Sequence, residues 1–198
     1  MNKSILMVGV GGQGTILTSK IISEGLLRQG YDVKMCEIHG MAQRGGSVTT
    51  QIKFGDKVYS TVIGTGEADV LVAFEKVEAA RYLHCLKPGG ALIVNDLEIY
   101  SLPVLSGAAK YPSDLEKKLA EKLPHAKIMN ANETARELGN EKVQNMVMLG
   151  LLVKTLELEE IDWESIIKEF VPQRFHDMNI QAFQAGIKYR KEKNHVSL

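Results

Sequence analysis

The chain has 198 residues, 44% of them apolar, which is enough to bury one sizeable core, and we expect a single domain over residues 1–198. Its 24 basic and 24 acidic side chains cancel, so the composition argues against nucleic acid or an anionic membrane as a partner. The two cysteines, Cys36 and Cys85, have no CxxC spacing, which excludes a disulfide framework or an iron–sulfur cluster held by this chain alone.

Apolar runs bounded by glycines alternate with segments of helical period along most of the chain. This pattern predicts βαβ units and a Rossmann-like, doubly wound α/β fold with a mainly parallel sheet. The predicted strands are residues 5–10, 33–38, 70–74, 91–95 and 127–130. The predicted helices are residues 14–30, 75–86, a segment ending at 123 behind a Ser113/Glu116 capping box, 143–158, 163–170 and 177 to about 193.

Two alternating runs follow the second predicted strand, at residues 48–54 and 58–63, and a Gly55-Asp56 turn separates them. We therefore expect an inserted β-hairpin here. The N-terminal apolar run is short and ends in glycines, so it predicts a strand and not a signal peptide. The other apolar stretch, 146–153, is interrupted by Gly150 and is far below the roughly 18 residues of a membrane span. We expect a cytoplasmic protein that does not enter a membrane.

A Gly-Val-Gly-Gly-Gln-Gly segment at residues 9–14 follows the first strand and opens the first helix. In this context glycines permit a tight turn and bring backbone amides close to a phosphate, although they also permit simple close packing of helix on strand. The candidate cofactor-binding residues are Gly9, Gly11, Gly12, Gln13 and Gly14. For Gln13 a hydrogen bond at the helix start is the alternative role.

Glu37, at the end of the second predicted strand, has the place of the acid that holds a ribose in dinucleotide-binding domains. This favours an NAD-dependent dehydrogenase as one alternative, and a non-catalytic nucleotide-binding module as another. A surface salt bridge would account for Glu37 equally well.

A second glycine-bearing segment, His-Gly-Met-Ala-Gln-Arg-Gly-Gly-Ser at residues 39–47, is not required by a plain dehydrogenase. Its glycines allow close approach to a ligand or another backbone, and the Arg44 guanidinium offers a forked set of donors to a carboxylate or phosphate. The candidate substrate or partner residues are His39, Gly40, Met41, Gln43, Arg44, Gly45 and Gly46. No catalytic residue and no metal-ligand set is identified in this chain.

The two segments at this separation resemble the gamma-type domain of 2-oxoacid:ferredoxin oxidoreductases. The His-Gly form of the second segment is most similar to the beta subunit of the indolepyruvate type. The resemblance extends over nearly the whole chain, including Gln-Asn-Met-Val-Met-Leu-Gly at residues 144–150.

The resemblance implies a small subunit that is inactive alone and supports the oxidative decarboxylation of a 2-oxoacid with coenzyme A, giving acyl-CoA, CO2 and reduced ferredoxin. It also implies that thiamine diphosphate and [4Fe-4S] clusters are carried by a large alpha subunit, with no cofactor held by this chain alone. Indolepyruvate or another aryl pyruvate is the expected substrate. Whether the isolated chain forms a homodimer stays open.

Overall fold

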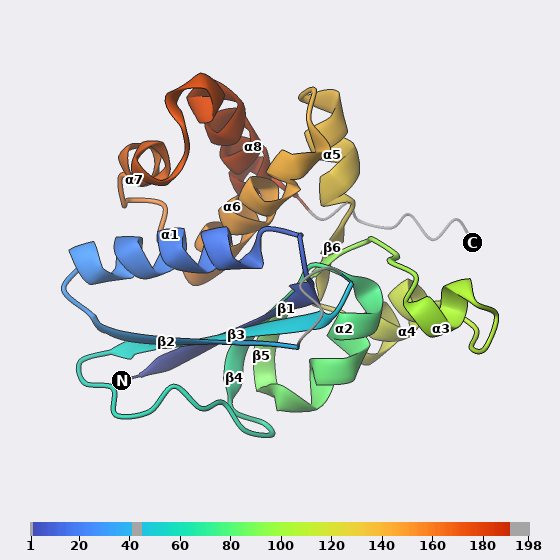
Figure 1. Cartoon of the computed structure of the whole chain (residues 1–198). Helices are drawn as coiled ribbons and strands as arrows, with labels where there is room; N and C mark the ends of the chain where they lie inside the picture. The colour runs from blue at the N-terminus through green and yellow to red at the C-terminus, as the bar shows by residue number, and fades with distance from the viewer. Residues whose placement is uncertain (1, 41–44, 191–198) are drawn as a thin grey trace, which may run out of the picture.

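The computed structural model describes residues 2–40 and 45–190 (Figure 1). The strands are β1 (Lys3–Val10), β2 (Asp32–His39), β3 (Ser47–Gly55), β4 (Ala68–Ala73), β5 (Leu86–Asn95) and β6 (Lys127–Met129). The helices are α1 (Thr15–Arg28), α2 (Lys76–Tyr82), α3 (Leu102–Leu105), α4 (Leu115–Lys122), α5 (Ala131–Glu137), α6 (Gln144–Leu156), α7 (Trp163–Phe170) and α8 (His176–Lys188). Short 3-10 turns occupy Leu83–Cys85, Glu141–Val143 and Gln173–Phe175.

The six strands form one sheet in the order β2-β3-β1-β4-β5-β6. Strands β1, β4, β5 and β6 pair in parallel, whereas β3 is antiparallel to both of its neighbours. The pairing of β3 with β1 runs from Lys3–Phe54 to Val10–Ser47 without a break. The predicted α/β class and mainly parallel sheet are therefore confirmed.

The predicted hairpin of residues 48–54 and 58–63 is wrong. The first run is β3, which lies between β1 and β2, while residues 57–64 form no strand. This second segment is an extended strap held by side chains: the Val58 N–H donates to Asp32 Oδ2 (2.9 Å) and the Ile63 N–H to Gln51 Oε1 (2.6 Å). Its alternation reflects Val58 and Ile63 turning inward while Tyr59 and Val62 remain exposed.

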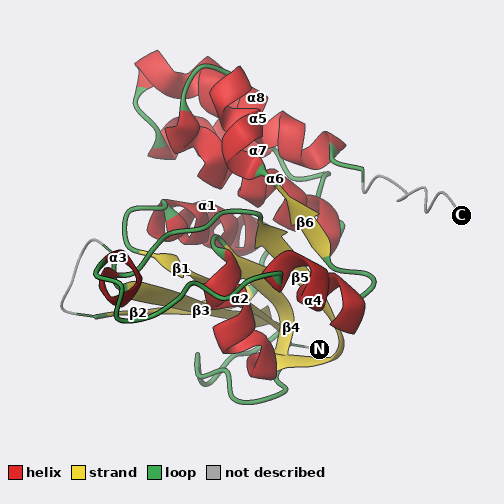
Figure 2. Cartoon of the chain, turned by 90° about the vertical axis from the view of Figure 1, so that its right-hand side faces the viewer, coloured by secondary structure: helices red, strands yellow, loops and turns green. Residues whose placement is uncertain are grey.

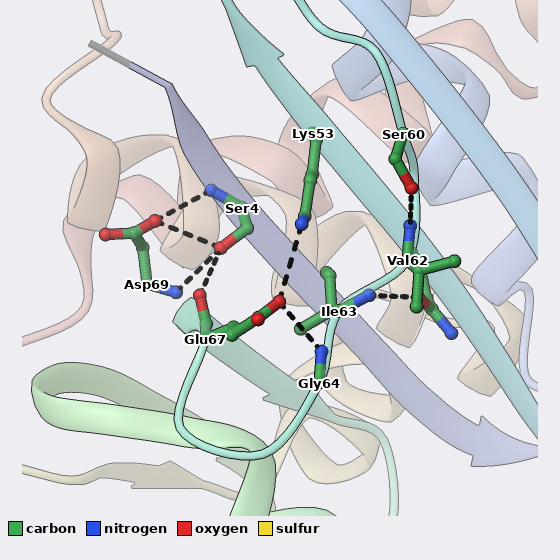
Figure 3. Close-up of polar contacts among 9 residues, drawn as sticks. Ser4, Lys53, Ser60, Val62, Ile63, Gly64, Glu67 and Asp69 are labelled. Carbon is green, nitrogen blue, oxygen red and sulfur yellow. Dashed lines mark hydrogen bonds and ion pairs between the residues drawn. The ribbon is translucent and has the colours of Figure 1, made fainter.

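The carboxyl-terminal end of the strap, at Gly64, is held near the start of β1 (Figure 3). Glu67 accepts from the Gly64 N–H (2.9 Å) and lies 3.5 Å from the Lys53 ammonium. Ser4 donates its hydroxyl to the Glu67 carbonyl at 2.7 Å, and both its backbone N–H and its hydroxyl reach Asp69. These contacts replace the ladder hydrogen bonds that a second hairpin strand would have made.

Helices cover both faces of the sheet (Figures 1 and 2). Ile5 and Met7 of β1 pack with α1 and with the layer formed by α5, α6, α7 and α8, whereas Leu6 and Val8 face α2 and α4 on the other side. This split follows from the two-residue period of a strand. The doubly wound arrangement is thus the reason that β1 reads as a continuous apolar run.

The local boundaries depart from the sequence pattern in several places. The helix predicted for residues 75–86 ends at Tyr82 and continues as a 3-10 turn. Residues 88–90, Pro-Gly-Gly, lie inside β5, where its register with β4 shifts. The predicted capping box is wrong, because α4 begins after Asp114 with φ 60° and no side-chain cap. Helices α3 and α5 were not predicted. Cys36 is exposed because β2 is the edge strand.

Helix α6 is buried along almost its whole length and is the centre of the C-terminal helical layer. A helix that is apolar on every side has to be buried on every side. Helices α1, α5 and α8 pack against α6 and bury it. Fully burying each Met, Leu or Val of this helix contributes about 1.5–3 kcal/mol. Within residues 2–40 and 45–190, no helix has both the length and the apolar character that crossing a membrane requires.

Candidate functional site

The first glycine segment forms the turn between β1 and α1. Gly14 is the N-cap of α1 in the left-handed conformation (φ 80°), and Gly12 has φ 103°, so both positions favour glycine. A Cβ on Gly9 would lie 2.8 Å from Gln13 Oε1 and 3.2 Å from Thr15 Cγ2. The turn is therefore as tight as the sequence predicts.

Gln13 fixes this turn from within. Its side-chain oxygen accepts from the Val10 N–H (2.7 Å), and its side-chain nitrogen donates to the Phe74 carbonyl (2.7 Å) at the end of β4. The side chain is 8% exposed. A ligand at this turn would therefore meet backbone amides, while Gln13 holds those amides in place.

The second glycine segment meets the first. The Gly11 N–H donates to the Gly46 carbonyl at 2.9 Å, and Gly45 adopts φ 80°. The antiparallel pairing of β3 with β1 causes this contact, because it ends at Val10–Ser47 and brings residue 46 beside the glycine turn. His39 and Gly40 lie at the end of β2, and His39 is exposed. The predicted residues Met41, Gln43 and Arg44 lie outside the described residues.

A buried network of side-chain amides supports the glycine turn and was missed in the sequence. Asn95, fully buried at the end of β5, donates to Asn132 Oδ1 (2.9 Å) and accepts from the Ala131 N–H (2.9 Å). Gln144 donates to the Gln13 carbonyl (2.7 Å) and contacts Asn95 at 3.3 Å. The network ties the carboxyl ends of β1 and β5 to the starts of α5 and α6. No sequence spacing signals it, because its members come from separate segments.

Two buried carboxylates lie at the start of α2, beside the same sheet edge. Glu75 caps the helix by accepting from the Glu78 N–H (2.9 Å) and also receives the Tyr111 hydroxyl. Burial, together with that hydrogen bond, raises the pKa of Tyr111 above its usual range. Glu78, 4% exposed, accepts from the Ser47 hydroxyl (2.5 Å) and from Arg81 (3.1 Å). Glu78 therefore connects the base of the second glycine segment to α2.

Two clefts open on either side of the glycine turn, and Gly12, Gly14 and Leu17 line both. The larger, of about 740 Å³, lies between the turn and the C-terminal helical layer, where Asn145 and Arg174 contribute to its wall. The smaller, of about 560 Å³, lies between α1 and the ends of β2 and β3 and is lined by Lys20, His39 and Val48 among others. The predicted cofactor and substrate segments are thus brought to one edge of the sheet.

Other reactive side chains do not join this edge. Burial raises the pKa of the Cys85 thiol, which packs beneath α2 and is poorly suited to act as a nucleophile. Among the described residues, no three His, Cys, Asp or Glu side chains are grouped so that they could hold a metal ion.

The Glu37 carboxylate does not take the position of a ribose-binding acid. In a dinucleotide-binding domain that acid ends the strand adjacent to β1, but here β3 occupies the adjacent position and moves β2 one place outward. With strands about 4.8 Å apart, Glu37 lies roughly 10 Å to the side of the glycine turn's strand. Its carboxylate instead accepts from Ser19 of α1 at 3.4 Å.

Comparison with known proteins shows the family of the chain. Residues 4–189 match the family described as pyruvate ferredoxin/flavodoxin oxidoreductase. The chain is 39% identical over 194 residues to the indolepyruvate oxidoreductase subunit IorB of Thermococcus kodakarensis, covering 96% of each chain. It is 30% identical over 192 residues to the 2-oxoglutarate synthase subunit KorC of Methanothermobacter marburgensis, covering 94% and 95% of the two chains.

A solved structure gives the same result at the level of the fold. The gamma subunit of a keto/oxoacid ferredoxin oxidoreductase from Geobacter sulfurreducens superposes with a TM-score of 0.68 and 26% identity, over 93% of this chain and 95% of that one. The chain belongs to the pyruvate ferredoxin/flavodoxin oxidoreductase family. The prediction of a small subunit of a 2-oxoacid:ferredoxin oxidoreductase is confirmed, in preference to an NAD-dependent dehydrogenase or a free-standing nucleotide-binding module.

Proposed function

We propose that this chain is the small subunit of an oxidoreductase specific for aryl pyruvates, indolepyruvate being the type substrate. With its large partner it supports the coenzyme A-dependent oxidative decarboxylation of the 2-oxoacid to acyl-CoA and CO2, with ferredoxin as electron acceptor. Thiamine diphosphate and [4Fe-4S] clusters, which supply the decarboxylation and the electron transfer, are assigned to the partner. The small subunit is a single cytoplasmic domain and is inactive alone.

The observation that carries the proposal is the hydrogen bond between Gly11 and Gly46. It joins the two glycine-bearing segments into one edge, at the carboxyl ends of the strands where ligands bind in open α/β sheets. This edge presents backbone amides and two clefts, but among the described residues no group of His, Cys, Asp or Glu side chains that could hold a metal ion. Such an edge is suited to completing a reaction centre held by another polypeptide.

The preference for aryl pyruvates is supported by the identity to indolepyruvate oxidoreductase subunits, which exceeds that to 2-oxoglutarate synthase subunits (39% against 30%). The smaller cleft offers an apolar wall of Ile16, Leu17 and Val48 beside the basic Lys20. An apolar wall with one cation suits a ligand that combines an aromatic ring with a carboxylate.

Co-purification with the large subunit, followed by viologen reduction, tests this function. Indolepyruvate and phenylpyruvate should support faster turnover than pyruvate, 2-oxoisovalerate or 2-oxoglutarate, and turnover should require coenzyme A and both subunits. Omission of the small subunit is the control for its contribution. Equal rates without it, or a clear preference for 2-oxoglutarate, would contradict the proposal.

The second glycine segment is tested in the same complex. Arg44→Ala should lower kcat/KM by at least about tenfold if the guanidinium binds an anionic group, because a charge-assisted hydrogen bond contributes about 1.5–3 kcal/mol. Arg44→Lys retains the charge but not the fork, and it should recover only part of the loss. Unchanged kinetics for both variants would remove Arg44 from the site.

A further inference from the structure

Strand β2 is a free edge of the sheet along its whole length. Its register with β3 is continuous from Asp32–Gly55 to His39–Val48. A long, regular edge strand presents a row of backbone N–H and C=O groups that can pair with another strand, and many proteins block such an edge with a bulge or a proline. Strand β2 contains neither, so its edge is open to pairing.

The register shows which backbone groups of β2 point outward. The Gly11 N–H donates to the Gly46 carbonyl, so the even-numbered residues of β3 direct their backbone groups toward β1 and the odd-numbered ones toward β2. The odd-numbered residues of β3 pair with the even-numbered residues of β2. The outward N–H and C=O groups are therefore those of the odd-numbered residues of β2, which are Val33, Met35, Glu37 and His39.

Exposed apolar side chains gather beside this edge. Ten large apolar side chains are exposed among the described residues, and seven of these lie on α1, on β2, on the turn before β2 or on the strap. They flank the edge on both faces of the sheet, because α1 covers one face and the strap runs along the other (Figure 1). Apolar groups that gather on a surface in this way mark an interface. The seven are Ile16, Leu27, Tyr31, Met35, Ile38, Tyr59 and Val62.

The outward residues of β2 match those of a second copy of the same strand. Two β2 strands can run antiparallel about a two-fold axis beside Cys36. Met35 then faces Glu37 of the second copy, and its backbone groups meet those of that residue. Val33 likewise faces His39. An axis beside Met35 or Glu37 would instead place one of the outward residues opposite a residue beyond the ends of β2.

The charges do not oppose this pairing. Lys34 faces Ile38 of the second copy, and Glu37 faces Met35, so no two charges of the same sign lie directly opposite each other. The chain as a whole carries no net charge, and two copies therefore have no overall repulsion to overcome.

Helix α1 has a fixed level relative to the proposed axis. The Ser23 hydroxyl donates to Met35 Sδ at 3.7 Å, and the Ser19 hydroxyl donates to Glu37 Oε1 at 3.4 Å. Cys36 lies between these two residues of β2. The level of the axis on α1 is therefore midway between the two serines.

The exposed side of α1 is self-complementary about that level. Ile16 and Leu27 lie on the same side of the helix as Ser23, above β2, and about 7.5 and 9 Å from the level of the axis in opposite directions. The axis therefore brings Ile16 of one copy beside Leu27 of the other. Since α1 lies over β2 and β3, the two α1 helices would be roughly 10 Å apart, a distance at which helices pack. Two Lys20 side chains approach each other near the axis, and the two Glu37 carboxylates below them balance this charge.

We propose that two copies of this chain pair antiparallel through β2, about a two-fold axis beside Cys36, and form one continuous sheet across the dimer. The strand ladder supplies the hydrogen bonds, and the exposed apolar side chains on both faces are buried beside it. Ile16 and Lys20 also line the smaller cleft, so the second copy would border that cleft. The proposal is independent of the proposed function, because it requires neither a substrate nor the large subunit.

Sedimentation equilibrium of the isolated full-length chain tests the pairing. The unaltered chain should be a dimer at micromolar concentrations. Met35→Pro removes an outward N–H at an edge position that otherwise tolerates proline, and it should raise the dimer Kd by about tenfold or more. Met35→Ala is the matched control, because it shortens the same side chain and keeps the N–H, and it should raise the Kd by a clearly smaller factor. Thermal unfolding of each variant verifies that the fold is retained.

Thiol cross-linking tests the register and does not depend on the proline variant. The Cys36 Cβ atoms of the two copies would lie about 4.5–5.5 Å apart, close to disulfide range. Diamide, which accepts the hydrogens of two thiols, should therefore convert the unaltered chain into a disulfide-linked dimer, and Cys36→Ser should prevent this. Lys34→Cys combined with Cys36→Ser moves the thiol on the same face to positions about 13 Å apart along the strand, and it should cross-link far more slowly.

The outcomes are distinct. A monomeric unaltered chain, or a dimer with the same Kd in the unaltered chain and Met35→Pro, would overturn the pairing. Cross-linking through residue 34 at least as fast as through Cys36 would overturn the register. If the unaltered chain were monomeric and Met35→Pro prevented its co-purification with the large subunit, the edge would belong to that subunit and the proposal would be wrong. No readout uses oxoacid turnover, so the dimer and the proposed function can fail separately.

Discussion

The Ser47 hydroxyl donates a hydrogen bond to the Glu78 carboxylate across 2.5 Å, joining the first residue of β3 to the first turn of α2. Because residue 46 is bonded to the glycine turn, this contact holds the second glycine segment from the opposite side. Glu78 is nearly inaccessible to water, so its hydrogen bonds are not readily replaced by solvent.

Glu78→Gln should therefore destabilise the chain by about 1–3 kcal/mol, because one half of the new amide is a donor facing a donor. Urea unfolding measures the effect. Arg81→Ala is the control, since it removes the other hydrogen bond to Glu78 from a largely exposed side chain and should cost less than about 1 kcal/mol. If the Arg81 variant were the more destabilised of the two, the Ser47 contact would not be the important one.

Gly14→Ala should destabilise the chain more than Gly30→Ala does. Both residues have positive φ, 80° and 83°, so both alanines carry a left-handed strain of about 1–2 kcal/mol. Only the Cβ at residue 14 meets Asn145, whereas no atom lies within 4 Å of one at residue 30. Overpacking should add about 1–3 kcal/mol at residue 14, measured as the difference between the two free energies of unfolding. Equal values would contradict the close approach of α1 and α6.

Gly150 and Gly186 lie face to face where α6 crosses α8, the pair of helices in most extensive contact. A Cβ on Gly150 would collide with the Phe183 carbonyl, and one on Gly186 with the Val147 carbonyl. Because backbone cannot move aside as a side chain can, either alanine should cost about 3 kcal/mol, seen as a lower midpoint of thermal unfolding. Gly64→Ala meets only ordinary contacts at 3.4–3.6 Å and should change stability by less than about 0.5 kcal/mol.

Asp69 should make stability depend on pH in the acid range. Burial acts to raise its pKa, but hydrogen bonds from Lys87 and Ser4 outweigh burial and hold the pKa below the usual value. Figure 3 shows the contacts with Ser4. A folded-state pKa below the unfolded one gives stability that is present above the unfolded value of about 3.8 and is lost as the pH falls through the folded value.

Asp69→Asn should therefore lower stability at pH 7 and flatten its decline below about pH 4. Free energies of unfolding at several pH values provide the measurement. Glu121→Gln, at an exposed position of α4, should leave the profile as it is. An unaltered slope in the Asp69 variant would show that other carboxylates control acid unfolding.

The amino-acid pattern was sufficient to predict most strands of the sheet and the position of the first glycine turn. Residues 5–10, 70–74 and 91–95 are apolar runs because both faces of those strands are covered. A short, continuous apolar run of this kind is enough to predict a buried strand. The alternation of residues 48–54 also identified a strand, but alternation does not specify a partner. The partners proved to be β1 and β2, and not the neighbouring strap, which uses side chains as its hydrogen-bond acceptors.

The residues that support the site were harder to predict. Asn95 and Gln144 belong to residue types that are usually exposed, and they are buried here because their side chains hydrogen-bond to residues of other segments, Asn132 and Gln13 among them. Gly150 appeared as an interruption of an apolar stretch, although it marks a helix crossing. These features depend on contacts distant in sequence, for which local pattern provides no signal.

Because β3 lies between β1 and β2, a change of chain length has different consequences inside β3 and in the interval before it. Adding or removing one residue within β3 would exchange its inward and outward side chains and would carry the second glycine segment away from the first. Changes of length between His39 and Ser47 would leave that pairing untouched, because both ends of the interval are held by the same ladder. The sheet can therefore keep its register through changes of length in this interval, but not through changes of length within β3.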